Sequence, residues 1–192
     1  MGMPLPIRIG LWVWLIAALI AGRFELLKPW PLPAVQAVLF GLTALLLLGC
    51  LRLPRLRDWI NGLDLRALVA FHLTRFVGVY FLILYRRGEL PRDFAVKGGL
   101  GDILVASFAL LICVVPLREA LRRRAITIWN VVGFLDIMMV VFYAARHGLA
   151  GNVQMKLLTV LPLSLLPTFI VPVIIASHLL IFLRLRRPDA PA

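Results

Sequence analysis

Six long runs of apolar residues constrain this chain more than any other feature of its sequence. They cover about residues 9–27, 35–51, 65–85, 100–117, 126–145 and 165–183. Each run reaches roughly the twenty residues that an α-helix needs to cross a bilayer, allowing for tilt and interfacial ends. The sequence therefore predicts an all-α fold, a polytopic integral membrane protein built as a six-helix transmembrane bundle.

The composition agrees with this class. Of 192 residues, 62% are hydrophobic and only 16% are charged, with a mean hydropathy of +0.97. A soluble core of this size could not hide so much apolar surface, whereas lipid can accept it. The length predicts a single domain over residues 1–192. Cys50 and Cys113 fall inside apolar runs without CxxC spacing, so no metal or redox motif is predicted.

The basic residues predict topology. A net charge of +12 would suggest nucleic acid in a soluble protein, but here the charges gather at the ends of apolar runs. Contact with the lipid bilayer is therefore expected, and no nucleic-acid partner. With the N-terminus inside, twelve basic residues lie inside and eight outside, and the inner ones cluster, as in residues 122–124. We expect a multi-pass protein of a bacterial inner (plasma) membrane with both termini cytoplasmic.

Two polar segments lie between the runs. Residues 55–64 (RLRDWINGLD) are too polar to cross a membrane and are predicted to lie on the inner surface. Residues 86–99 contain charges, Pro91 and glycines, and are predicted to form the longest outer loop.

Ionisable residues inside the runs are the first candidates for a functional site, because charges in hydrocarbon are costly and face a partner or a cavity. Arg75 lies in the middle of the third run, one helical turn after His72, and Asp136 lies at a similar depth in the fifth. Two interpretations stay open: an Arg75–Asp136 pair that locks the bundle, and a site in which Arg75 binds an anionic group. Asp102 is expected near the outer end of the fourth run, close to water.

His72 and His178 suggest a second constellation. Each lies six residues from an arginine at the inner end of its run, Arg66 and Arg184 respectively. Both are thus about 9 Å below the inner surface. Equal depth on two helices is what axial ligation of haem b requires. The alternative is that the two histidines form hydrogen bonds across helices.

The stretch Gly99-Leu100-Gly101-Asp102 resembles the GxGD motif of aspartyl intramembrane proteases, which include prepilin and presenilin-type peptidases. This resemblance covers four residues and implies a peptidase in which Asp102 and a second aspartate share a proton and activate water. Asp136 is the candidate second aspartate. It follows the motif, whereas the family's partner aspartate precedes it, and no Tyr-Asp or Pro-Ala-Leu pattern is present.

Prolines mark the approach to the sixth run. Pro162, Pro167 and Pro172 each remove an amide donor, so this helix should be kinked or preceded by a broken segment. The freed carbonyls would bind a substrate, as in transporters, or be satisfied by Ser164, Thr168 or neighbouring helices.

For function, the sequence favours a non-enzymatic membrane protein that binds or transports a small solute or ion through a polar core. The candidate binding residues are Arg75, Asp136, His72 and Asp102. Walker, Rossmann, HExxH and GxSxG patterns are absent, and no catalytic or metal-binding residues are predicted. The alternatives are a haem b electron-transfer subunit with His72 and His178 as ligands, a GxGD-type protease using Asp102 and Asp136, and a non-catalytic assembly subunit.

Overall fold

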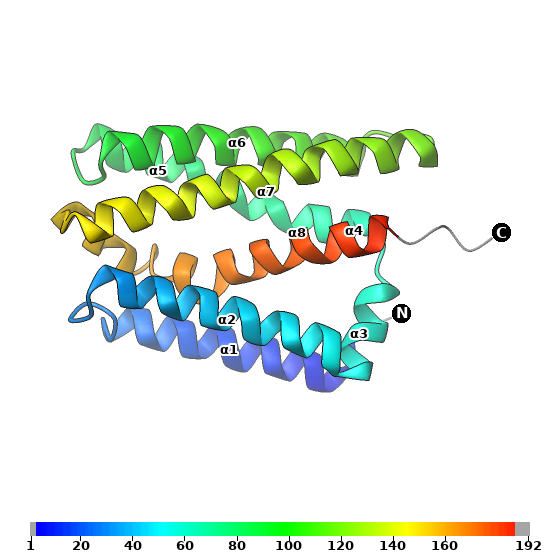
Figure 1. The fold of residues 1–192 in the computed structure, drawn as a ribbon, viewed down its shortest axis with the longest axis horizontal. Coiled ribbons are helices and arrows are strands. Elements are labelled where there is room, and N and C mark those ends of the chain that lie inside the picture. The colour runs from blue at the N-terminus through cyan, green and yellow to red at the C-terminus, as the bar shows by residue number, and fades with distance from the viewer. Residues whose placement is uncertain (1–2, 187–192) are drawn as a thin grey trace.

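The computed structural model describes residues 3–186, and in this range the chain is helical and contains no strand. Figure 1 shows the long helices running side by side, with the short α3 across one end. The elements in chain order are α1 (Leu5–Arg23), α2 (Leu32–Arg52), α3 (Pro54–Asn61), α4 (Leu65–Phe71), η1 (His72–Val77), α5 (Gly78–Arg86), α6 (Arg92–Val114), α7 (Glu119–Leu149), η2 (Val153–Thr159), η3 (Leu166–Ile170) and α8 (Val171–Leu185).

Six helical stretches of the described chain are long and apolar enough to cross a membrane, which confirms the predicted number. They are Leu5–Arg23, Leu32–Arg52, Leu65–Arg86, Arg92–Val114, Glu119–Leu149 and Leu166–Leu185. Four begin with a proline within or directly before the first turn. Proline suits this position because the first amides of a helix have no partner inside it.

The fourth long helix begins earlier than the sequence predicted. α6 starts at Arg92, so the expected outer loop over residues 86–99 is wrong in its second half. The early turns of α6 expose Arg92 and Lys97 but bury Phe94 and Ala95, and a span defined by continuous apolarity misses such an amphipathic start. Asp102 therefore stands ten residues inside the helix, about 15 Å from its beginning.

The third long helix is interrupted in the middle. A 3₁₀ segment, His72–Val77, separates α4 from α5, where the sequence indicated an unbroken helix over 65–85. Thr74 Oγ1 donates a 2.8 Å hydrogen bond to the Phe71 carbonyl beside this change of winding. In a 3₁₀ helix residues three apart are eclipsed, so His72 and Arg75 stand one above the other.

The predicted break before the sixth helix is confirmed. The chain passes from the 3₁₀ segment η2 through turns into the π-helix η3, and only then into α8. Pro172 has no amide hydrogen for the Thr168 carbonyl, and Trp14 Nε1 of α1 donates to that oxygen instead at 2.8 Å. Thr168 Oγ1 donates to the Ser164 carbonyl at 2.6 Å. The carbonyls of Ser164 and Thr168 are thus satisfied from within the protein, the second by a neighbouring helix.

Glycines bring the central helices together. A Cβ atom on Gly78 would overlap the Gly99 carbonyl and come within 2.9 Å of Asp102 Cβ. Ordinary side chains at these positions would hold the backbones apart, so α5 and α6 approach closely here because both positions lack one. This contact sets Arg75, three residues before Gly78, beside Asp102.

α3 covers most of the polar segment over residues 55–64. Its one buried residue is Ile60, whose carbonyl accepts a 3.3 Å hydrogen bond from Arg184 of α8. Asp64 then caps α4 by accepting from the Arg66 amide at 2.8 Å. The Arg66 side chain also donates to this carboxylate and, as the largest cause, lowers the pKa of Asp64.

Candidate functional site

Arg75 is at the centre of a buried ion cluster. Its side chain is 1% exposed, and three of its nitrogens donate to three different acceptors. Nε donates to Asp102 Oδ1 of α6 at 2.6 Å, one terminal nitrogen to the Gly133 carbonyl of α7 at 3.0 Å, and the other to Asp136 Oδ2 of α7. We call these groups the Arg75 cluster. It joins the interrupted third helix to both α6 and α7.

The cluster confirms one predicted pairing and corrects another expectation. Arg75 does pair with Asp136. Asp102, expected near the outer end close to water, is instead buried and is a second partner of Arg75. The misplacement follows from the early start of α6, which carries Asp102 to the depth of Arg75.

The charges of the cluster do not balance. One guanidinium faces two carboxylates, so with both aspartates ionised the cluster carries one excess negative charge. The arginine is also already engaged on three sides. An anionic ligand would add to the negative excess, and the geometry therefore argues against Arg75 as an anion clamp.

His72 and His178 form a histidine pair next to the cluster. Both are fully buried, with ring centroids 4.3 Å apart and planes tilted by 55°. His72 Nε2 lies 2.9 Å from Ser177 Oγ, and His178 Nδ1 lies 2.8 Å from Asn130 Oδ1. The predicted equal depth is therefore found, and each histidine bonds across helices, although not to the other histidine.

The neighbours of the pair determine which ring nitrogens carry protons. Asn130 Nδ2 donates to the His178 carbonyl, so Oδ1 faces the ring and His178 Nδ1 must be the donor. Ser177 Oγ gives its single hydrogen to the Ile174 carbonyl, so it accepts from His72 Nε2. In the neutral rings, His72 Nδ1 and His178 Nε2 are thus unprotonated, and both are buried without a hydrogen-bond partner.

This geometry does not fit a haem held between the two histidines. Axial ligands stand on opposite faces of the macrocycle, with the iron between their nitrogens. Here the two imidazoles are in direct contact, and Trp129 stacks edge-on against His72 with centroids 4.8 Å apart. The space that a porphyrin would need between the rings is filled by the rings themselves.

The aspartates also differ from the arrangement that the GxGD resemblance implies. A proteolytic dyad must position a water for attack, and for this it needs carboxyl oxygens that are free to bind the water. Asp102 and Asp136 each accept a hydrogen bond from Arg75, which links the two carboxylates. Gly101 leaves room for the Asp136 side chain, because a Cβ at this position would overlap the Asp136 carboxylate.

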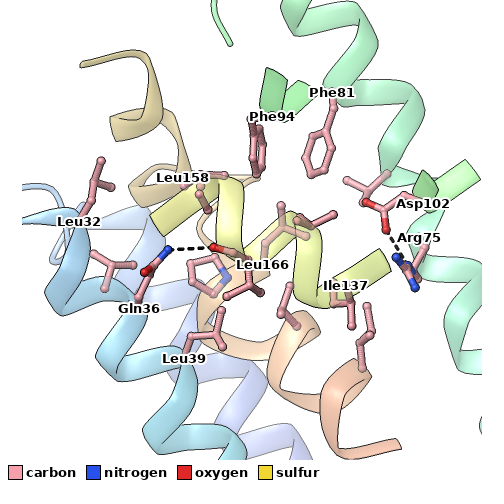
Figure 2. Close-up of a pocket in the computed structure, with 18 residues that line it drawn as sticks. Leu32, Gln36, Leu39, Arg75, Phe81, Phe94, Asp102, Ile137, Leu158 and Leu166 are labelled. Carbon is pink, nitrogen blue, oxygen red and sulfur yellow. Dashed lines mark hydrogen bonds and ion pairs between the residues drawn. The ribbon is translucent and has the colours of Figure 1, made fainter. Parts of the chain in front are cut away.

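A largely apolar pocket extends from the cluster toward the end of the bundle where α2, α6 and the α7–η2 turn meet. It encloses about 690 Å³ including its open side. Arg75 and Asp102 line one side and Gln36 the opposite side, as Figure 2 shows. The wall between them is apolar: Val35, Leu39, Phe81, Phe94, Ile137, Val140 and Val141, among others. Gln36 Nε2 donates to the Val141 carbonyl at 3.3 Å and so joins α2 to α7.

Three contributors to the polar core were missed from the sequence: Asn130, Ser177 and the Gly133 carbonyl. Asn130 is a polar amide near the start of the fifth apolar run, and this position in the sequence could have predicted a buried hydrogen bond. Gly133 gives space as well as its carbonyl, because a Cβ there would lie 2.8 Å from His178 Cε1. Among residues 3–186, no group of three or more His, Cys, Asp or Glu side chains could hold a metal ion.

The fold and its core define an all-helical bundle with buried charges, and one family model matches most of this bundle. The chain belongs to the family described as Domain of unknown function (DUF8737), whose model matches residues 32–186. The matched region contains the Arg75 cluster, the histidine pair and every lining residue of the pocket, while α1 precedes it. No curated protein and no solved structure matches the chain significantly.

Proposed function

We propose that this protein is a multi-pass membrane protein that binds, and passes across the membrane, a small and largely apolar solute. Six long apolar helices support the membrane placement. Bulky apolar side chains such as Trp12, Leu45, Leu135 and Phe142 are exposed on the outside of the bundle, where lipid would cover them. Clustered arginines at the end that holds α3 support a cytoplasmic location for that end and for both termini.

The observation that carries the proposal is the pocket. Binding sites for small molecules are mostly apolar clefts with a few polar groups that orient the ligand. This pocket has that composition, with Arg75 and Asp102 at one side and Gln36 at the other. With both aspartates ionised the cluster carries an excess negative charge, so the solute it suits in that state is neutral or carries a basic group, such as an amine, at one end.

A fluorescent apolar amine tests this proposal. 1-Aminoanthracene added to the purified full-length protein in detergent should become brighter and bind with saturation. Val141→Phe places a larger side chain in the pocket wall and should weaken binding at least tenfold. Val132→Phe, the same substitution on an exposed face of α7, is the matched control and should bind as wild type.

Thermal unfolding of both variants in the same detergent separates a blocked pocket from a damaged fold. A stable Val141→Phe protein that no longer binds supports the site. Absence of saturable binding to the wild type, or equal binding to both variants, would contradict the proposal.

A further inference from the structure

The polar core lacks one positive charge. Among residues 3–186, the buried charged and imidazole side chains are His72, Arg75, Asp102 and His178, and Asp136 adjoins them with its side chain 10% exposed. These five come from η1, α6, α7 and α8, and they face one another across the same interior. With both histidines neutral and both aspartates ionised, their sum is one negative charge. An uncompensated charge in a water-poor interior is costly, so the core must acquire a cation.

We propose that this cation is a proton, which Asp102 and Asp136 hold jointly beside Arg75, and that the free nitrogens of His72 and His178 are its next acceptors. Binding converts one carboxylate to a carboxylic acid and brings the core from one negative charge to neutrality. In the proposed function, this proton is the ion whose binding is coupled to binding of the solute, and in this respect the inference rests on that function. The link between the two is Asp102, which contacts Arg75 and also lines the pocket.

The oxygen and nitrogen atoms available in the core favour a proton over a metal cation. Alkali and alkaline-earth cations need a cage of several oxygen ligands, and the two carboxylates already accept from Arg75. No group of three or more suitable side chains exists in the described chain. A proton needs no cage, since one carboxylate oxygen or one imidazole nitrogen is sufficient.

The histidine pair provides an independent observation. His72 Nδ1 and His178 Nε2 are buried lone pairs without donors. Ser177 and Asn130 hold the rings in opposite tautomers, each with its free nitrogen left to accept a proton. The pair also adjoins the cluster, because the Gly133 carbonyl accepts a hydrogen bond from Arg75. Gly133 also lies against His178, whose Nε2 would be 3.2 Å from a Cβ on Gly133. Buried chains of Asp and His side chains are the usual proton paths of membrane proteins.

Infrared spectroscopy of the purified full-length protein tests the shared proton without any solute. At neutral pH the wild type should show the carbonyl band of one protonated carboxyl group in an apolar environment. Asp102→Asn and Asp136→Asn should each abolish this band, because the remaining carboxylate is balanced by Arg75. Asp58→Asn, at an exposed carboxylate of α3, is the control and should leave the band unchanged.

Several results would overturn the inference. One is a wild-type spectrum without a protonated carboxyl band. Another is a band that survives in one of the two single variants, since that proton would belong to one aspartate alone. The wild-type spectrum decides the first point even if a variant folds poorly.

Nitrogen NMR of ¹⁵N-histidine-labelled protein tests the acceptors, with His147→Gln removing the third histidine signal. His72 should be neutral with its proton on Nε2, and His178 neutral with its proton on Nδ1. Two imidazolium signals, or a proton on His178 Nε2, would contradict the assignment. A protein that binds the amine probe but lacks the carboxyl band refutes only this inference, whereas one with the band and no probe binding refutes only the proposed function.

Discussion

The third and the sixth long helices are both interrupted, and they differ in what interrupts them. In the sixth, Pro167 and Pro172 remove backbone donors, and a π-helix precedes the regular helix. In the third, the 3₁₀ segment His72–Val77 contains no proline or glycine. Its two conspicuous residues, His72 and Arg75, are instead held by partners on α6, α7 and α8.

This difference separates two ways to break a helix. Proline acts through the local chain, so the break is visible in the sequence and its freed carbonyls only need new donors. The break in the third helix is stabilised by distant contacts, which offset the poorer hydrogen-bond geometry of 3₁₀ winding. The proline break organises the approach to α8, and the 3₁₀ break in the third helix positions the buried charges.

The largest expected effect comes from removing the contacts that hold the third helix. Arg75→Ala leaves two carboxylates buried without their cation and should destabilise the protein by about 3–5 kcal/mol. Denaturant unfolding in detergent, followed by circular dichroism, measures this loss. Arg57→Ala, at an exposed ion pair of α3, is the control and should change stability by less than about 0.5 kcal/mol.

A triple variant sharpens the interpretation of that result. Arg75→Met combined with Asp102→Asn and Asp136→Asn removes all three charges and should regain most of the stability that Arg75→Ala loses. A triple variant as unstable as Arg75→Ala would show that the arginine acts through its shape and packing rather than through charge compensation.

Gly78→Ala should have the next largest effect, because it disturbs the point where the third helix meets α6. The added methyl group would overlap the Gly99 carbonyl and press on Asp102. Overpacking of this kind costs about 1–3 kcal/mol. Gly41→Ala on α2 has open space around its Cβ and should be neutral or slightly stabilising. Equal unfolding midpoints for the two variants would argue against close helix approach as the basis of the cluster.

For the sixth helix the expected effect is smaller. Trp14→Phe removes the donor to the Thr168 carbonyl and should cost about 1 kcal/mol. Trp12→Phe, on the exposed side of α1, is the control. Pro172→Ala restores an amide that can serve Thr168, so Trp14→Phe should cost less in that background. Identical costs in both backgrounds would mean that Trp14 does not compensate for the proline.

The smallest effect concerns the beginning of the third helix. The Arg66 side chain, as the main cause, lowers the pKa of Asp64 below its ordinary value. The native carboxylate therefore contributes stability above the pKa of the unfolded chain, about 3.9, and loses it as pH falls through the lower native pKa. Asp64 is half-exposed, so Asp64→Ala should cost only about 0.5 kcal/mol at neutral pH. The difference from wild type should disappear in acid, and a difference that persists there would point to a contact other than the ionised cap.

Part of the fold and of the candidate site was predictable from the sequence. The six apolar runs, the polar segment that contains α3, and the proline-linked break are properties of consecutive residues. The pairing of Arg75 with Asp136 could be predicted from depth along two helices. The start of α6 could not be predicted, because its early turns alternate exposed charges with buried apolar residues. The depth of Asp102, and with it the pairing with Arg75, was therefore missed.

What the sequence determined by itself is a chain of long apolar helices that must bury a few ionisable side chains. Hydropathy and helix-breaking residues act locally, so this much can be read without knowing which helices are neighbours. Only the tertiary structure decided that Arg75 holds two aspartates at once, that the third helix winds as 3₁₀ beside them, and that His72 and His178 touch. These features depend on the rotation and separation of helices, which the glycine contacts between α5, α6 and α7 determine across long distances in the chain.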